Sequence, residues 1–579
     1  MKQKFAAAVR CYADGQLAET EALCREILRQ TPHFAGALVL FAVVLCRADQ
    51  HDKRLQAIAL LQHALRIEPN DPQTLDILGD AFTAEGDVDA AIDVYGRAIR
   101  TMPRNAKLHS KLGVALNDSG RHDAAIAAYR EAIVLDPQAA QTYFNLGVAL
   151  TDAGRRVEAI EAYQQAIARR PNDAAAYVNI GGLYREGGQI ERAIEAFRAA
   201  VRADRRHVIA RFQLAACLHD SDEHEPALEF MREVIAERHD LPEAHFLLGN
   251  ILLALGRPAE AKEAFAAEIA LNPTNVQAHN NLGAALHDLG DLEAAAAMHR
   301  RALALDPTHV QAYINLGVTL QEQGDLAGAR VACEQALALE PSNPHRQAKA
   351  LSNLGVVLEQ EGQHEAALAM HQRAAALAPD LAKVRFNLGV QLLRTDDFAA
   401  GWDEYEWRWR GGVATLKMPD IPRPMWDGSP LYGRTLLVHA EQGLGDTLQF
   451  ARYLDPLRRM SGHVILVAPG ALTPLLRSIK GVTVRDSGEN LPLFDVHIPL
   501  MSVARVLATR LDTIPAKVPY VAADPATVAA WRRRIGNDGA LKVGLVWSGN
   551  PDHKYDHQRS IPAATILPAL MMPGVKLFA

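Results

Sequence analysis

The segment AQTYFNLGVALTDAGRRVEAIEAYQQAIARRP, residues 140–171, carries the pattern that decides the fold. Its apolar residues fall at helical spacing in two runs, and a short turn containing glycine separates the runs. Leu146-Gly147 lies in the first run, Tyr163 lies in the second, and Pro171 ends the pattern because proline cannot continue a helix. The segment is therefore predicted to form a pair of helices that approach closely at their small residues.

The same pattern recurs along the chain, and its closing prolines mark the period. Two sets of three prolines have a spacing of 34 residues: Pro103, Pro137 and Pro171, and Pro273, Pro307 and Pro341. Pro32, Pro69 and Pro379 continue the series after insertions of three or four residues. Arg205 and His239 replace the proline in two copies, which are still expected to fold because Phe197 and Met231 keep the apolar pattern. A fixed period of this length predicts an α-solenoid.

The repeats resemble the tetratricopeptide repeat, with roughly twelve copies over residues 1–410. The characteristic tryptophan of that repeat occurs in none of the copies. The resemblance implies a superhelix with one continuous core and a long concave face. A protein or peptide bound in that face is the partner that the resemblance implies.

One polar position recurs in the repeats, immediately before the Leu-Gly or Ile-Gly pair. An amide there offers both a donor and an acceptor, so a row of amides can hold an extended peptide backbone. The alternative is that each amide bonds the backbone of a neighbouring helix. Gln213 and Leu247 interrupt the row. A similar asparagine row occurs in the repeats of O-linked N-acetylglucosamine transferases; the members here are Asn145, Asn179, Asn281, Asn315, Asn353 and Asn387.

Composition narrows the possible environments and partners. The net charge of −7 is mild and no basic block occurs, so nucleic acid is not an expected partner. The five cysteines are scattered without a CxxC pair, as in a reducing compartment. No apolar run approaches the length of a membrane helix, and the first ten residues are too short and too charged for a signal peptide. A cytoplasmic protein is expected.

The composition shifts near residue 400, and all six tryptophans lie beyond that point. The segment from Gly401 to Arg410 contains Trp402, Trp407 and Trp409 in phase with the last repeat. It is predicted to seal the end of the solenoid against the next domain. Four prolines between residues 419 and 430 then predict an extended linker.

Short apolar strands alternate with helical segments after Arg434, which predicts a parallel sheet of the βαβ type. A polar helix is expected around Trp531. Ligands of such sheets bind where the strands end and the helices begin. The predicted strands are Thr435–His439, Val464–Ala468, Val482–Arg485, Val496–Leu500, Val543–Ser548 and Val575–Phe578.

The loop after the first of these strands, HAEQGLGDTLQF, spans residues 439–450. Gly443 and Gly445 permit close backbone approach and positive φ. Asp446 follows at the expected start of a helix, where it either faces a ligand cleft or simply caps the helix.

The loop after the fifth strand, WSGNPDHKYDHQRS, spans residues 547–560. Ser548, Asn550, Lys554 and Arg559 could contact phosphate. A solvated loop is the alternative. A metal site at His553 and His557 is disfavoured because no second set of ligands accompanies them.

These two loops resemble those of the family 9, heptosyltransferase-like glycosyltransferases, which implies a Rossmann-like GT-B fold. The resemblance implies that Asp446 is the general base, that Arg559 contacts the donor diphosphate, and that a nucleotide sugar is the co-substrate, with no metal or other cofactor. The family commonly has lysine where Arg559 stands. The substrate-binding positions implied in the two loops are Gln442, Gly443, Gly445, Gln449, Ser548, Asn550, Lys554 and Arg559.

The expected division of the chain is repeats over 1–410, linker over 411–433, acceptor lobe over 434–540 and the start of a donor lobe over 541–579. The second lobe is expected to be incomplete, since the sequence ends at Ala579 before the lobe's nucleotide-contacting residues. Two functions therefore stand side by side. One is a repeat scaffold that carries a transferase moving a sugar to a protein or glycan hydroxyl, and the other is a non-catalytic interaction scaffold with a degenerate transferase tail.

Overall fold

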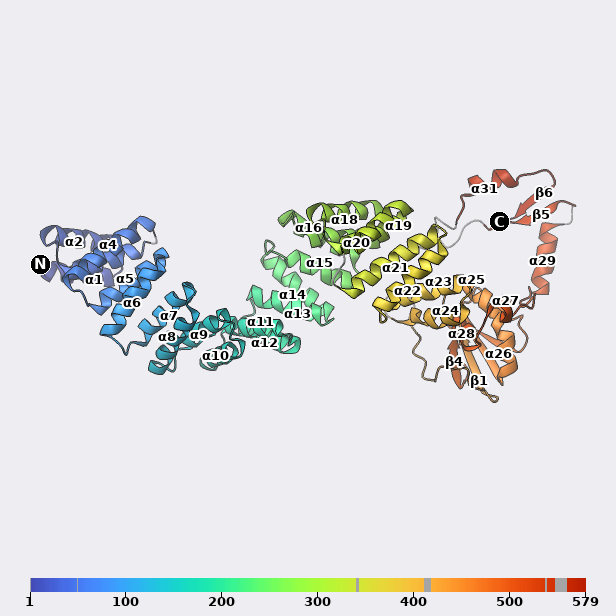
Figure 1. Cartoon of the computed structure of the whole chain (residues 1–579), viewed down its shortest axis with the longest axis horizontal. Helices are drawn as coiled ribbons and strands as arrows, with labels where there is room; N and C mark the ends of the chain where they lie inside the picture. Colours follow the sequence, from blue (N-terminus) through green and yellow to red (C-terminus); the bar gives the residue numbers. More distant parts are fainter. Residues whose placement is uncertain are drawn as a thin grey trace. The chain divides into compact units, whose positions relative to one another are not determined.

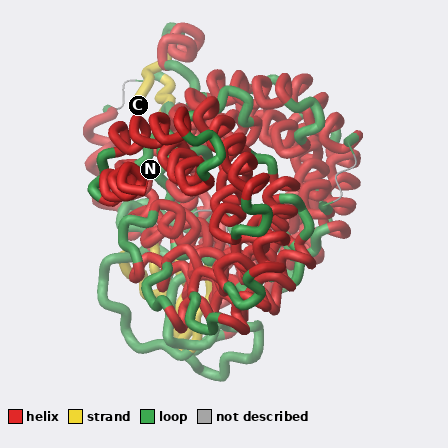
Figure 2. The backbone as a smooth tube through the Cα atoms, turned by 90° about the vertical axis from the view of Figure 1, so that its left-hand side faces the viewer, coloured by secondary structure: helices red, strands yellow, loops and turns green. Residues whose placement is uncertain are grey.

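The computed structural model describes residues 2–48, 50–339, 343–410, 418–536, 539–546 and 560–578. The chain divides into two compact units, residues 1–307 and residues 308–579. Helices make up most of the described chain, and strands occupy a small part of it (Figure 2). Of the described helices, none is both long enough and apolar enough to cross a membrane.

Unit 1 consists of consecutive helix pairs (Figure 1). Its helices are α1 (Lys2–Ala13), α2 (Leu17–Gln30), α3 (Ala35–Cys46), α4 (His51–Ile67), α5 (Pro72–Glu85), α6 (Val88–Thr101), α7 (Ala106–Asp118), α8 (His122–Leu135), α9 (Ala140–Asp152), α10 (Arg156–Arg169), α11 (Ala174–Glu186), α12 (Ile190–Ala203), α13 (Val208–Asp220), α14 (His224–Glu237), α15 (Ala244–Ala254), α16 (Pro258–Leu271), α17 (Val276–Asp288) and α18 (Leu292–Leu305).

The small residues of the pattern explain the close pairing of the helices. A Cβ atom added to Gly147 in α9 would lie 2.7 Å from the ring of Tyr163 in α10, so only glycine allows this approach. Gly113 meets Tyr129 in the same way. The copies that lack the closing proline form complete pairs, α11–α12 and α13–α14, as expected.

The first helices of neighbouring repeats also touch each other in unit 1. Contacts join α7 to α9, α11 to α13, and α13 to α15. The first helices therefore form one shared face, and the second helices lie behind it. The solenoid prediction is confirmed in this unit.

Unit 2 begins with further helix pairs and continues into a region with a parallel sheet (Figure 1). Its elements are α19 (Val310–Gln323), α20 (Leu326–Ala338), α21 (Pro344–Gln360), α22 (His364–Leu377), α23 (Ala382–Arg394), α24 (Phe398–Tyr405), η1 (Glu406–Trp409), β1 (Thr435–His439), α25 (Leu444–Phe450), η2 (Ala451–Tyr453), α26 (Leu454–Met460), β2 (His463–Ala468), α27 (Thr473–Leu476), β3 (Val482–Asp486), β4 (Val496–Pro499), η3 (Leu500–Ser502), α28 (Val503–Val506), η4 (Leu511–Thr513), α29 (Pro525–Ile535), β5 (Leu541–Gly544), α31 (Ala563–Leu570) and β6 (Val575–Phe578).

The four strands β1 to β4 form one parallel sheet in the order β3-β2-β1-β4. Leu437 of β1 is in register with Ile465 of β2 and with His497 of β4. The four predicted strands agree with these strands to within one residue at each end. Because β1 has β2 on one side and β4 on the other, the chain changes direction across the sheet at β1.

The remaining strands, β5 and β6, form a separate parallel pair. The sixth predicted strand matches β6. Strand β5 overlaps the predicted strand Val543–Ser548 only in part, because it begins at Leu541 and ends at Gly544. Helix α29 contains Trp531, as expected.

The aromatic segment after the last repeat packs into the core of the sheet region. Trp402 and Tyr405 belong to the same apolar cluster as the strands, and the rings of Trp402 and Phe450 lie 6.1 Å apart. The predicted sealing role is thus confirmed within unit 2. Trp426, in the segment predicted as linker, is 1% exposed, and its backbone N–H donates to the backbone carbonyl of His497 (2.7 Å).

Candidate functional site

A pocket of about 380 Å³ opens on the face that the first helices form in unit 1. Residues of α9, α11 and α13 line it, together with the buried side chains of Tyr163 in α10 and Phe197 in α12. Its size is within the range of sites that hold a small ligand or a side chain of a partner. The polar residues that line it are Thr151, Asp152, Asn179, Arg185, Glu186 and Gln213.

Asn179, a member of the predicted row, lines this pocket together with Gln213, which is not a member. The side chain of Asn179 hydrogen-bonds the hydroxyl of Tyr163, whose pKa is raised mainly by burial. Gln213 accepts a hydrogen bond from Arg185 Nη1 (2.6 Å). Gln213 had been expected to interrupt the row, but it lines the same pocket as Asn179. Both the shorter asparagine side chain and the longer glutamine side chain thus place an amide in the lining of this pocket.

The other members of the row are half-buried, and their described hydrogen bonds go to side chains. Asn145 accepts from Gln141 (3.0 Å), and Asn281 donates to Asn250 Oδ1 (2.8 Å) in unit 1. In unit 2, Asn315 accepts from Gln311 (2.8 Å), Asn387 donates to Ser352 Oγ (3.1 Å), and Asn353 is likewise half-buried. The bonds of Asn281 and Asn387 reach the preceding first helix, so these amides tie neighbouring repeats together.

The second candidate region is the carboxyl edge of the sheet in unit 2. Strands β1 and β4 end side by side there, and Glu441, just after β1, accepts from the backbone N–H of Met501 in η3 (2.8 Å). In sheets of this order, ligands bind in the crevice between two such strand ends.

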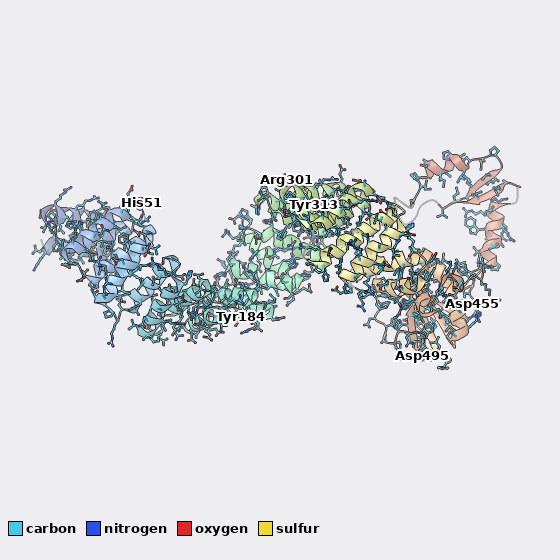
Figure 3. All side chains as sticks on the ribbon, in the orientation of Figure 1. His51, Tyr184, Arg301, Tyr313, Asp455 and Asp495 are labelled. Atoms are coloured by element: carbon cyan, nitrogen blue, oxygen red, sulfur yellow. The ribbon has the colours of Figure 1, made fainter. Side chains whose placement is uncertain are left out.

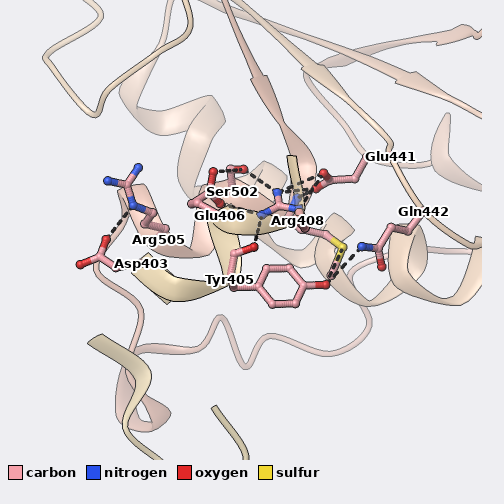
Figure 4. Close-up of polar contacts among 9 residues, drawn as sticks. Asp403, Tyr405, Glu406, Arg408, Glu441, Gln442, Ser502 and Arg505 are labelled. Atoms are coloured by element: carbon pink, nitrogen blue, oxygen red, sulfur yellow. Dashed lines mark hydrogen bonds and ion pairs between the residues drawn. The ribbon is translucent and has the colours of Figure 1, made fainter. Parts of the chain in front are cut away.

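Arg408, from the end of the last repeat, enters this crevice (Figure 4). Its guanidinium donates to Glu441 Oε2 (3.0 Å), Glu406 Oε1 (2.8 Å) and Ser502 Oγ (2.7 Å). The side chains of Arg408 and Glu441 are 0% and 2% exposed. Burial raises the pKa of Glu441, and Arg408 opposes that shift. This buried network holds the repeats and the sheet together within unit 2.

Asp446 lies beside this network, in the first turn of α25. It is half-buried, and its Oδ2 accepts from the backbone N–H of Gly443 (3.2 Å), so it caps the helix. Neither glycine of this loop adopts the positive φ that glycine permits: Gly443 has φ −62° as the residue before the helix, and Gly445 lies inside α25 without positive φ.

The other loop residues lie around Asp446. Gln442 Nε2 donates to the hydroxyl of Tyr405 (3.2 Å). Gln449 is exposed, and its backbone carbonyl accepts a hydrogen bond from Arg452 Nε (3.0 Å). Four predicted phosphate contacts, as well as His553 and His557, lie outside the described residues: Ser548, Asn550, Lys554 and Arg559. The residues that the structure does describe contain no group of three or more His, Cys, Asp or Glu side chains placed to hold a metal ion.

Two buried pairs in this region were missed by the sequence analysis. Glu441 belongs to the quoted loop, but nothing in its neighbours indicated an arginine partner 33 residues away. His439 Nε2 lies 3.3 Å from His497 Nδ1 across β1 and β4. Burial, and then the neighbouring His497 and Arg408, lowers the pKa of His439 to about 4. The only feature of the sequence that could have indicated this histidine pair is the position of His439 at the end of an apolar strand.

Comparison with known proteins identifies the repeats. Residues 8–239 match the family described as the cilia and flagella-associated protein 70 C-terminal domain. Residues 246–310 and 308–380 match tetratricopeptide repeat families. The chain is therefore a tetratricopeptide repeat protein, and these matches leave the parallel-sheet region without an assigned family.

Individual relatives cover only parts of the chain. Protein FlbA of Caulobacter vibrioides is 28% identical over 216 residues, which are 34% of this chain and 36% of FlbA. The chain thus spans little more than a third of that relative. The solved structure of YrrB, described as a TPR protein with an unusual peptide-binding site, is 24% identical and covers 32% of this chain and 96% of its own, with a TM-score of 0.31. The solved MamA protein is 26% identical over 29% of this chain and 92% of its own, with a TM-score of 0.28.

Proposed function

We propose that this chain is a protein-binding scaffold whose first-helix face holds an extended peptide segment. The pocket lined by Asn179 and Gln213 carries the proposal, because it combines paired amides with apolar walls. Amides recognise the peptide backbone, whereas the apolar walls accept one side chain of the bound segment. Within unit 1, Asn145 at the same position of the preceding repeat would extend the contact along the peptide.

Removing both pocket amides is expected to weaken peptide binding. Peptides selected from a random displayed library on the full chain serve as probes, and fluorescence anisotropy gives their dissociation constants. Each lost hydrogen bond removes about 1 kcal/mol of binding free energy, so Asn179→Ala with Gln213→Ala should raise Kd on the order of tenfold or more.

The matched control removes an amide from the outer row of helices. Gln164 is exposed on α10 and does not line the pocket, so Gln164→Ala should leave Kd unchanged. Selection of no peptide, or the same loss in the control, would argue against this binding face.

A glycosyltransferase-type activity is the second candidate. One observation favours it: the sheet order β3-β2-β1-β4 puts the loop with Asp446 at the point where the chain changes direction. In this proposal Asp446 is the base toward an acceptor hydroxyl, and Gln442, Gly443, Gly445 and Gln449 line the substrate side. The donor diphosphate contacts would come from Ser548, Asn550, Lys554 and Arg559, and residues 434–540 and 541–579 would be the two lobes.

Asp446→Asn separates the catalytic role from the capping role of this residue. Asparagine keeps an oxygen that can accept from Gly443 N–H but cannot take a proton. The expected result is a loss of about 10²–10⁴-fold in nucleotide release from a panel of nucleotide sugars, with thermal stability unchanged.

Asp427→Asn is the control for that experiment. Asp427 Oδ1 accepts from the backbone N–H of Ser429 (2.9 Å), a local turn contact of the same kind away from the Asp446 loop. Wild-type chain that releases no nucleotide from any donor, or Asp446→Asn that releases it at the wild-type rate, would remove the catalytic role and leave the scaffold alone.

A further inference from the structure

A second pocket, of about 520 Å³, lies in the sheet region of unit 2, and its lining includes no residue of the described loop 439–450 that contains Asp446. The segment that ends in α26, the turn before β3 and the segment 513–522 form its walls. Arg459 lies four residues before β2, and Lys480 lies two residues before β3. The pocket thus borders the amino ends of these parallel strands, whereas Asp446 follows the carboxyl end of β1.

The lining of this pocket is strongly basic, although the whole chain has a net charge of −7. Among the described residues, five Arg and Lys side chains line it, and Asp455 is the one carboxylate. Asp455, labelled in Figure 3, already accepts from Arg458 (2.9 Å) and from Arg459. These two hydrogen bonds lower the pKa of Asp455, and Lys517 is close enough to lower it further.

Two of the cations remain available for a ligand. Lys480 and Lys517 are exposed and form no ion pair within the part of the chain that the structure describes. One carboxylate cannot neutralise five cations, so the pocket keeps a surplus of positive charge.

The pocket also has a defined shape and an apolar side. Arg458 lies over Gly481, where a Cβ atom would come within 2.6 Å of Arg458 Cδ, and Gly481 has φ +78°. The guanidinium of Arg452 lies 5.3 Å from the centre of the Tyr520 ring. Ile479 and Pro519 complete a wall that apolar groups of a ligand can contact.

We propose that this pocket binds a small phosphate-bearing ligand of the diphosphate type, with its phosphates at Lys480 and Lys517 and its remaining part against Tyr520. Lysine ammonium and arginine guanidinium groups are the usual protein partners of phosphate oxygens. A hollow of this volume favours a small molecule over an extended polyanion. The proposal does not depend on peptide binding by the repeats or on catalysis by Asp446.

Calorimetric titration of the full chain tests the proposal, with inorganic pyrophosphate and a nucleoside diphosphate as probes at constant ionic strength. We expect saturable binding of one molecule per chain. Lys480→Gln with Lys517→Gln should raise Kd on the order of tenfold or more, whereas Lys480→Arg with Lys517→Arg should retain most of the affinity. A lower Kd for the nucleoside diphosphate than for pyrophosphate would locate the apolar contact at Tyr520.

Lys349→Gln with Lys383→Gln is the matched control, because both lysines are exposed on repeat helices of unit 2 and the change in net charge is the same. This variant should bind the probes like wild type. Three outcomes would overturn the proposal: no saturable binding of either probe, an equal loss in the control variant, or binding only to vesicles containing anionic lipid or to an oligonucleotide. Tryptophan fluorescence at its wild-type value confirms that each variant is folded.

Discussion

Arg408→Met is expected to lower the free energy of unfolding of the sheet region by about 3–5 kcal/mol. The substitution leaves the carboxylate of Glu441, 2% exposed, without its main cationic partner. Glu406 and Ser502 lose hydrogen bonds at the same time. An unpaired buried charge costs far more than the net contribution of the ion pair.

Tryptophan fluorescence during urea unfolding measures this effect selectively. All six tryptophans lie at or after residue 402, so their emission reports on this region and not on the helices of unit 1. The midpoint of the fluorescence transition should fall, while the far-ultraviolet circular dichroism of the repeats should change little.

Two further variants make the result specific to the network. Arg410→Met removes an exposed arginine that lies over Trp407, and its effect should be within about 1 kcal/mol. Arg408→Met combined with Glu441→Gln should recover part of the loss because the buried charge is gone. If Arg408→Met unfolds at the wild-type midpoint, the network does not hold the two parts together.

His371→Phe is expected to stabilise the repeat formed by α21 and α22, and the gain should grow in acid. His371 is 0% exposed, and neither ring nitrogen has a hydrogen-bond partner among the residues that the structure describes. It packs against Gly355 where other repeats place tyrosine or phenylalanine against glycine. Removing two unpaired buried nitrogens should raise the free energy of unfolding by about 1–3 kcal/mol near pH 7.

The sign of the pH dependence follows from burial. Burial lowers the pKa of His371 from 6.5 to about 4. Between these values the unfolded chain binds a proton that the folded chain does not, so the wild-type protein loses stability as pH falls from 6.5 to 4. The full loss is about 3 kcal/mol for this histidine, and His371→Phe should remove it.

Hydrogen exchange of peptides from α21 and α22, at pH 7 and near pH 5, measures both effects. His299→Phe provides the comparison, since His299 also has a pKa of about 4 but donates through Nδ1 to Asn280 Oδ1 (3.1 Å). Phenylalanine there breaks that bond, so the gain near pH 7 should be smaller than at His371. Equal exchange in wild type and His371→Phe at both pH values would contradict this account.

The sequence alone determined the architecture of the repeats. Helix pairs, their small contact residues and their period follow from local patterns, because each repeat packs mainly on the next one along the chain. The strands of the sheet were predicted for the same reason, since apolar runs bounded by turns are local signals. Spacing predicts Asn179 as a member of the amide row and predicts Gln213 as an interruption, because spacing does not reveal that both amides line one pocket.

Only the tertiary structure decided the sites that join distant segments. Arg408 meets Glu441 and also Ser502, 94 residues away, because the last repeat packs on the strand ends. The basic pocket draws on three segments between residues 452 and 522, none of which contains a basic block. Parallel strands bring residues together across long crossovers, and no local pattern records which side chains then become neighbours.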